Sequence, residues 1–201
     1  MAMRNGDVAW GDCDNDGDLD LLLTGEDTAE NRLARLFSYH QGTFANIGSF
    51  GDLSKSSADW GDYDNDGDLD LAIMGQSNDV LNGRQQSYTY VFDNDGLGGF
   101  NQTEQDIVGL NNGELLWADY DNDGDLDLAA TGRSNEDALE FRIYTNVDAE
   151  FADAGMDLPG LESSDLAWGD YDGDGDLDLY VANSGGANVL YRNNGNGTFA
   201  D

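Results

Sequence analysis

The chain is poor in the residues that build covalent, catalytic and cationic sites. It contains one cysteine, one histidine, one proline and eight lysines and arginines among 201 residues. A single cysteine excludes an intramolecular disulfide framework, and one histidine with one cysteine provides too few ligands for a typical zinc or iron site. His40 has no repeated serine or cysteine nucleophile to accompany it. We therefore expect that the protein is not an enzyme.

Long apolar segments and positive charge are also missing. No apolar run approaches the roughly 18 residues needed to span a membrane, and Met1 to Gly6 is too short and polar for a signal peptide. The formal net charge is -34, from 42 acidic and 8 basic residues. This balance argues against nucleic acid and anionic membranes as partners, and against membrane insertion. Self-repulsion on this scale opposes folding unless cations neutralise it.

A nine-residue acidic loop is present instead, in four copies, each introduced by a tryptophan two residues earlier. The tryptophans are 50, 57 and 51 residues apart, a period close to that of a four-stranded propeller blade. Aspartate occupies positions 1, 3, 5, 7 and 9 of every copy. These candidate metal ligands are Asp12, Asp14, Asp16, Asp18 and Asp20; Asp62, Asp64, Asp66, Asp68 and Asp70; Asp119, Asp121, Asp123, Asp125 and Asp127; and Asp170, Asp172, Asp174, Asp176 and Asp178.

The spacing of these aspartates predicts a calcium site in each loop. Carboxylates at positions 1, 3 and 5, a backbone carbonyl at position 7 and a carboxylate at position 9 form the oxygen shell that calcium prefers. Glycine at position 6 supplies the left-handed backbone that the turn needs. An EF-hand is excluded because apolar residues stand where its glutamate at position 12 belongs, and magnesium requires a smaller, stricter octahedron. We expect about four Ca²⁺ ions, one per repeat.

Strand patterns follow each loop. A short apolar run predicts a strand buried on both faces, and a second strand is expected at Arg32–Tyr39, Tyr88–Asp93, Phe141–Asn146 and Val189–Asn193. The segment Ala29–Phe37 could form a helix by composition, but its counterparts in the other copies cannot. The third copy lacks the glycine-rich turn before its phenylalanine, so we expect an irregular outer hairpin there. Because such small sheets must stack to bury both faces, the sequence predicts an all-β fold, a β-propeller of four blades.

Two stretches, Trp60 to Leu71 and Leu190 to Phe199, resemble the FG-GAP (VCBS-type) repeat, the blade of the integrin α-subunit propeller, and the resemblance covers nearly the whole chain. It implies calcium ligands at Asp12, Asp14, Asp16 and Asp20 and at the equivalent positions of the other loops. It also implies an extracellular or cell-surface location and a role in adhesion, glycan binding or partner docking. We expect a single propeller domain over residues 1–201, with repeats at 7–56, 57–113, 114–164 and 165–201.

The resemblance leaves the ring open to three interpretations, because the family usually closes with seven blades and this chain supplies four. The chain is a four-bladed ring, half of an eight-bladed ring completed by a homodimer, or a fragment of a larger propeller. The fixed place of Trp10, Trp60, Trp117 and Trp168 in the repeat favours packing between blades over a ligand platform.

Ligand contacts are expected in the loops of unequal length, Gly25–Asn31, Gly75–Ser87, Gly132–Leu139 and Ser184–Asn188, where Arg84, Arg133 and Tyr88 are candidates. The partner is an unknown protein or glycan. A lectin, a portion of a carbohydrate-active enzyme and a structural spacer are the alternatives to a calcium-stabilised recognition module.

Overall fold

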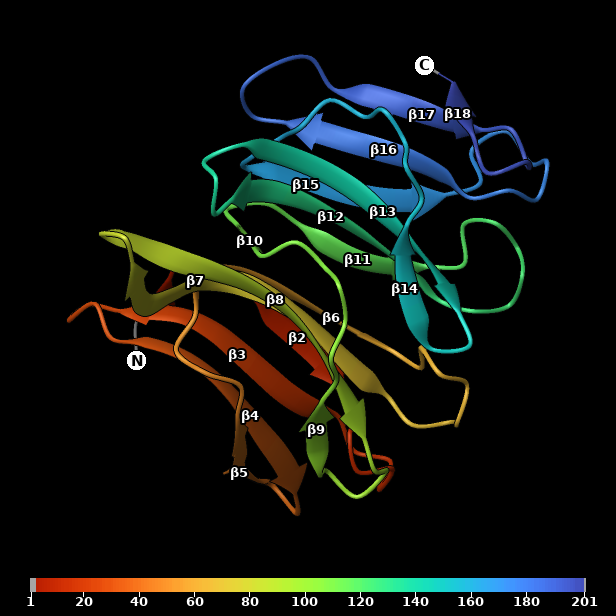
Figure 1. Ribbon diagram of the computed structural model, residues 1–201. Coiled ribbons are helices and arrows are strands. Elements are labelled where there is room, and N and C mark those ends of the chain that lie inside the picture. Colours follow the sequence, from red (N-terminus) through yellow and green to blue (C-terminus); the bar gives the residue numbers. More distant parts are fainter. Residues whose placement is uncertain (1–2, 201) are drawn as a thin grey trace.

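Four antiparallel sheets make up the computed structural model, which describes residues 3–200, and they follow one another in chain order (Figure 1). The first sheet contains β1 (Met3–Arg4), β2 (Val8–Gly11), β3 (Asp20–Asp27), β4 (Arg32–His40) and β5 (Thr43–Ser49). The second contains β6 (Ser54–Gly61), β7 (Asp70–Leu81), β8 (Arg84–Asn94) and β9 (Phe100–Gln102). The all-β prediction is confirmed.

The last two sheets repeat the same order. The third contains β10 (Leu110–Asn111), β11 (Leu115–Ala118), β12 (Asp127–Ser134), β13 (Leu139–Val147) and β14 (Glu150–Asp153), and the fourth contains β15 (Ser164–Gly169), β16 (Asp178–Asn183), β17 (Val189–Asn193) and β18 (Phe199–Ala200). Within each sheet the strand after the acidic loop pairs with the strand before it and the strand after it. Each sheet therefore has the strand order of a propeller-like blade, with β1 and β10 as short additions that pair with β3 and β12.

The core lies between the sheets rather than inside any one of them. Three apolar clusters fill the three junctions between successive sheets. The middle cluster packs Met74 of β7 against Leu115 of β11 and Leu128 of β12, all three fully buried. Apolar burial of this kind contributes about 1.5–3 kcal/mol per large side chain, so the sheets depend on one another for stability.

The segment Ala29–Phe37 contributes to β4, so the strand assignment is confirmed and no helix forms there. The sheets begin at Met3, Ser54, Leu110 and Ser164, slightly before the repeat boundaries expected from the sequence. Among residues 3–200 no helix has the length and apolar character to cross a membrane.

Two local predictions were wrong. The segment Gly75–Ser87 is largely a hairpin rather than a loop, because β7 and β8 stay paired as far as Leu81 and Arg84. Its turn is Asn82 and Gly83, both with positive φ, which matches the right-handed twist of the strands.

The outer hairpin of the third repeat is regular. Val147 pairs with Glu150, and the two residues between them, Asp148 and Ala149, have φ values of 52° and 66°. Left-handed conformations at both positions make a tight two-residue turn without glycine. An irregular register occurs instead between β4 and β5, at Leu36 and Phe37.

Candidate metal centres

Each acidic loop connects the first two long strands of its repeat, and its last aspartate is the first residue of the following strand. These position 9 side chains, Asp20, Asp70, Asp127 and Asp178, are at most 1% exposed. Every one of them accepts a backbone hydrogen bond from loop position 2, at 3.0–3.1 Å, through Oδ2. Oδ1 accepts a second backbone hydrogen bond from the third strand, at 2.8–2.9 Å. The two donors on each carboxylate offset the cost of burying it.

The carboxylates of positions 1 and 3 lie close to each other in every loop. In three loops, oxygens of positions 1, 3 and 9 lie within 4.8 Å of one another: Asp12, Asp14 and Asp20; Asp119, Asp121 and Asp127; and Asp170, Asp172 and Asp178. In the second loop the group is Asp62, Asp64 and Asp66. The structure therefore gathers at least three of the predicted ligands in every repeat.

The turn of the loop has the backbone that the sequence predicts at position 6. Gly17, Gly67, Gly124 and Gly175 have φ values of 90°, 98°, 99° and 96°. The amide of each glycine donates a hydrogen bond to the carboxylate of position 1, at 3.0–3.1 Å. Position 4 is also left-handed, with φ of 56°, 61° and 62° at Asn15, Asn65 and Asn122 and 77° at Gly173. This second left-handed position was not foreseen from the sequence.

Unpartnered oxygens show that the clusters are suited to a cation. Asp14 Oδ1 and Asp62 Oδ1 are buried and have no hydrogen-bond partner. Burial raises the pKa of Asp70 to about 7, against the opposing effect of its two backbone hydrogen bonds. Burial likewise raises the pKa of Asp127 to about 7. A hard divalent cation would satisfy these oxygens and favour their charged form, so the residues present fit calcium.

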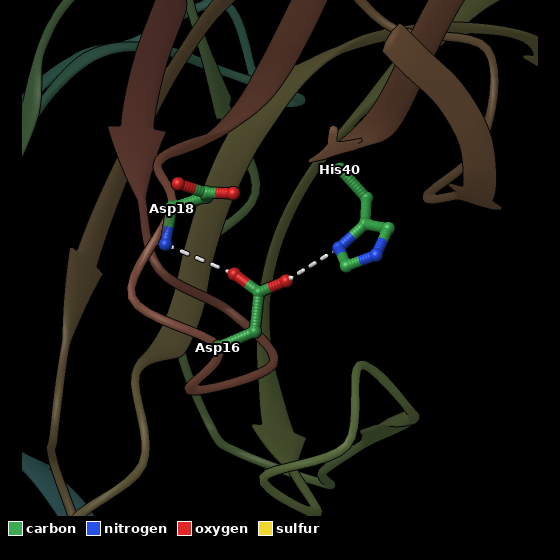
Figure 2. A group of neighbouring side chains, drawn as sticks. All are labelled: Asp16, Asp18 and His40. Atoms are coloured by element: carbon green, nitrogen blue, oxygen red, sulfur yellow. Dashed lines mark hydrogen bonds and ion pairs between the residues drawn. The ribbon is translucent and has the colours of Figure 1, made fainter. Parts of the chain in front are cut away.

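Position 5 of the first loop is directed elsewhere. Asp16 Oδ2 lies 3.2 Å from Nδ1 of His40, the last residue of β4, and Asp16 Oδ1 accepts the backbone amide of Asp18 at 2.9 Å (Figure 2). The backbone hydrogen bond from Asp18, followed by the His40 contact, lowers the pKa of Asp16 from its ordinary value. The histidine thus sits beside a loop carboxylate, and only this repeat has such a contact because His40 is the single histidine.

Three of the four position 7 side chains contact the preceding repeat. The amides of Asn15, Asn65 and Asn122 donate to Oδ1 of Asp68, Asp125 and Asp176, at 2.7, 2.8 and 2.9 Å respectively. Position 4 of one loop is thereby joined to position 7 of the next. In the sequence the signal was the asparagine at position 4 of three copies together with aspartate at position 7 of all four.

A second set of links was missed. Asn94, Asn146 and Asn193, at or near the ends of β8, β13 and β17, donate through Nδ2 to the position 2 carbonyls of Cys13, Tyr63 and Tyr120 in the preceding repeat. These three asparagines are at most 1% exposed. Tyr39 takes the equivalent place in the first repeat, since its amide bonds to Asp20 as theirs do to their own position 9. These asparagines could not be recognised as inter-repeat donors from the sequence, because asparagine is also common in turns.

Three of the four repeat tryptophans, Trp60, Trp117 and Trp168, pack between sheets, whereas Trp10 in the first sheet is 53% exposed. Trp117 stacks on Tyr63 of the preceding loop with ring centres 6.0 Å apart, and Trp168 on Tyr120 at 6.4 Å. Trp60 packs against the cluster that contains Cys13, the residue at the same loop position in the first repeat. Cys13 is fully buried, its thiol lies 2.9 Å from Asp20 Oδ2, and burial raises its pKa. These positions support the packing interpretation for Cys13 and for the three later tryptophans, but not for Trp10, which has no preceding sheet among residues 3–200 to cover it.

Comparison with known families gives one match. The sequence profile described as an FG-GAP-like repeat matches residues 12–73, 119–181 and 170–201, which is more than half of the chain. No curated protein matches the chain significantly. The matched segments begin at position 1 of the first, third and fourth acidic loops, and the segment 12–73 also contains the whole second loop.

Proposed function

Because the chain belongs to the FG-GAP-like repeat family, we propose that its four acidic loops bind calcium and that the sheets they stabilise form a non-catalytic recognition or adhesion module outside the cell. The single observation that carries the calcium assignment is the convergence of three carboxylates in every loop, within 4.8 Å. Without a cation such a group repels itself strongly. The buried, unpartnered oxygens of Asp14 and Asp62 support the same assignment.

Calcium has a structural role in this proposal. Positions 1 and 3 lie in the loop, whereas position 9 begins the buried strand and is hydrogen-bonded to the third strand. In the first, third and fourth loops, where oxygens of positions 1, 3 and 9 converge, an ion held by all three would tie the loop to the centre of the sheet. If each site were saturated at 100 times its dissociation constant, it would contribute about 2.7 kcal/mol to stability. Four such contributions would be comparable to the total stability of a typical domain.

Recognition is the better functional assignment because the histidine and cysteine offer no catalytic pair. His40 contacts Asp16 in the first loop, and Cys13 is buried with a raised pKa. FG-GAP repeats are typical of extracellular proteins, which is consistent with a protein or glycan partner. A lectin remains the alternative, and a portion of a carbohydrate-active enzyme the second one; glycan binding and release of reducing ends from polysaccharides distinguish them.

The end faces of the array suggest how a second copy completes a ring. Trp10 in the first sheet is 53% exposed, whereas its counterpart Trp117 is 8% exposed. Tyr171 in the last sheet is 56% exposed, whereas Tyr120 is 3% exposed. A cavity of about 370 Å³ beside Tyr171 is bordered by Trp168, Gly169, Tyr180 and Leu190. Stacking of Trp10 from a second copy on Tyr171 would repeat the internal tryptophan contacts.

Native mass spectrometry in a calcium-containing volatile buffer tests both parts of the proposal. Four calcium ions on a species near 21.7 kDa are expected for the single chain, and eight ions on twice that mass for the dimer. A protein that carries no calcium, or whose melting temperature is unchanged in excess EDTA, would overturn the metal assignment. A monomer at all concentrations would overturn the homodimer alone.

A further inference from the structure

Two basic side chains, Lys55 and Arg84, have no side-chain hydrogen bond and no ion pair within residues 3–200, although the chain carries 42 acids. Both border one cavity of about 470 Å³ between the second and third sheets. Arg133 borders it too, but is held by Glu162 through two hydrogen bonds of 2.7 and 2.9 Å. The hydrogen bonds from Arg133, and after them the charge of Lys55, help to lower the pKa of Glu162. Neither Lys55 nor Arg84 forms an ion pair among residues 3–200, and cations without an ion pair in so acidic a protein point to an external anion.

The cavity lies at the hairpin ends of the sheets, away from the metal loops. The acidic loops lead into the first residues of strands β7 and β12 (Figure 1). The cavity borders the far ends of these strands, at Arg84 after the β7 turn and at Ser134 at the end of β12. Its volume is within the range of about 300–1,000 Å³ found for ligand sites. The acidic loops and this cavity therefore lie at opposite ends of the strands.

A glutamine pair adds hydrogen-bond donors to the two cations. Arg32 from the first sheet donates to Oε1 of Gln76 at 3.2 Å and to Oε1 of Gln85 at 2.9 Å. Because these carbonyl oxygens are occupied, each side chain is left with its amide NH₂ group to offer, and both residues border the cavity. The side chains of Lys55, Arg84, Gln76 and Gln85 thus present donors, a set that matches the oxygens of an anion.

Hydrogen bonds already hold one side of the cavity, where residues of the second and third sheets meet. Asn135 accepts the backbone amide of Ser87 at 2.7 Å and donates to its carbonyl at 3.0 Å. Asn111 donates to Ser87 Oγ at 2.8 Å and to the carbonyl of Arg133 at 2.9 Å. Ser87 and Asn111 are 2% and 4% exposed. This network joins the second and third sheets beneath the free donors and reduces the ordering that a ligand would have to impose.

We propose that this cavity, the anion pocket, binds the carboxylate or sulfate group of an acidic saccharide. The polar walls match sugar hydroxyl groups, and the absence of an apolar wall among the residues that border the cavity disfavours an apolar ligand. The net charge of -34 repels polymers with densely spaced negative charges, so the negative charges of the ligand must be well separated. The proposal rests on the recognition role proposed above and gives it a location and a ligand chemistry.

Chemical-shift titration of ¹⁵N-labelled protein at low ionic strength and in saturating calcium tests the anion pocket. The probes are D-glucuronate, D-glucose 6-sulfate, neutral D-glucose and a short oligoglutamate peptide. We expect saturable shifts at Gln76 and Gln85 with one or both anionic sugars. Comparison of the affinities for D-glucuronate and D-glucose 6-sulfate shows whether the pocket prefers a carboxylate or a sulfate group. No saturable shift, equal binding of glucose, or tighter binding of the peptide would overturn the proposal.

A double variant, Lys55→Gln with Arg84→Gln, is expected to weaken binding at least tenfold. Arg35→Gln is the matched control, since Arg35 lies in β4 and pairs with Asp52 outside the pocket. Unchanged affinity in a folded double variant would contradict the proposal. Calcium stoichiometry measured on the same samples separates the anion pocket from the calcium assignment. Four bound ions without sugar binding would contradict the anion pocket alone. Sugar binding by a protein that carries no calcium would contradict the calcium assignment alone.

Discussion

Asn65 in the second acidic loop donates a hydrogen bond of 2.8 Å to Oδ1 of Asp125 in the third. The two residues are 60 positions apart, and the same contact recurs between the first and second loops and between the third and fourth. Asn65 also lies in the left-handed region, with φ of 61°. Asn65 therefore shapes its own loop and connects it to the next, so a hydrogen bond joins the two neighbouring acidic loops.

Replacing Asn65 by glycine should remove this link without straining the turn, since glycine adopts positive φ freely. Loss of an exposed, charge-assisted hydrogen bond should lower the free energy of unfolding by about 1 kcal/mol in urea titrations with saturating calcium. Gly173→Asn is the matched control at concentrations where the protein is monomeric: no loop follows it among residues 3–200 to offer a position 7 partner, and we expect no gain in stability. Equal stability of Asn65→Gly and the unmodified protein would show that the link contributes nothing.

Two neutralising substitutions in one loop should separate a metal ligand from an inter-repeat contact. Asp121 belongs to the cluster of the third loop, whereas the side chain of Asp125 faces Asn65. Asp121→Asn should reduce the number of calcium ions in native mass spectra from four to three at limiting calcium. Asp125→Asn should retain four, because position 7 offers calcium its backbone carbonyl and the new amide oxygen can still accept from Asn65. Loss of an ion in Asp125→Asn would make its carboxylate a ligand.

The periodic features of the fold were predictable from the sequence because each repeat supports the others. Four glycines at position 6 required a left-handed turn, and all four have it. The strand at Arg32–His40 could be assigned against its helical composition only because the counterparts in the other repeats were strands. Repetition thus supplied the tertiary information that a single segment lacks.

Contacts between repeats were harder to predict. Asn94 bonds to a carbonyl 81 positions away, and nothing in its local sequence distinguishes it from a turn residue. Asp148 and Ala149 form a tight turn in a segment without glycine, since pairing of β13 with β14 stabilises left-handed conformations that their side chains disfavour. Such features depend on the packed structure rather than on local preference.

Stability should fall as pH rises through the range in which Glu114 titrates. Burial, and then the nearby charges of Asp7, Asp165 and Asp59, raise the pKa of Glu114 from 4.5 to about 7. Between pH 4.5 and about 7 the folded protein therefore keeps a proton on Glu114 that the unfolded chain has already released. The stability that this protonation provides is lost as the pH rises to about 7. A shift of this size corresponds to at most about 3 kcal/mol, and solvent screening of the partly exposed carboxylate makes the effect smaller.

Glu114→Gln removes this dependence and should be more stable than the unmodified protein at pH 8 but not at pH 4.5. The comparison uses urea unfolding in saturating calcium at both pH values. Glu136→Gln, an exposed loop substitution with the same charge change, corrects for the effect of net charge and for weaker calcium binding in acid. A variant whose stability follows that of Glu136→Gln at both pH values would exclude Glu114 as the titrating group.

Equivalent tryptophans should differ in their importance according to their place in the array. Trp117 is 8% exposed, stacks on Tyr63 and donates through Nε1 to the carbonyl of Asp59 at 3.2 Å. Trp117→Ala should therefore cost about 3–5 kcal/mol in urea unfolding, as expected for a buried aromatic residue. Trp10 occupies the same position of the first repeat but is 53% exposed. At concentrations where the protein is monomeric, Trp10→Ala should cost under about 1 kcal/mol. In the proposed homodimer the ring of Trp10 would pack on Tyr171, so the cost of Trp10→Ala should increase at concentrations where two copies associate. Similar costs for both variants in the monomer would contradict the assignment of Trp10 to an uncovered end face.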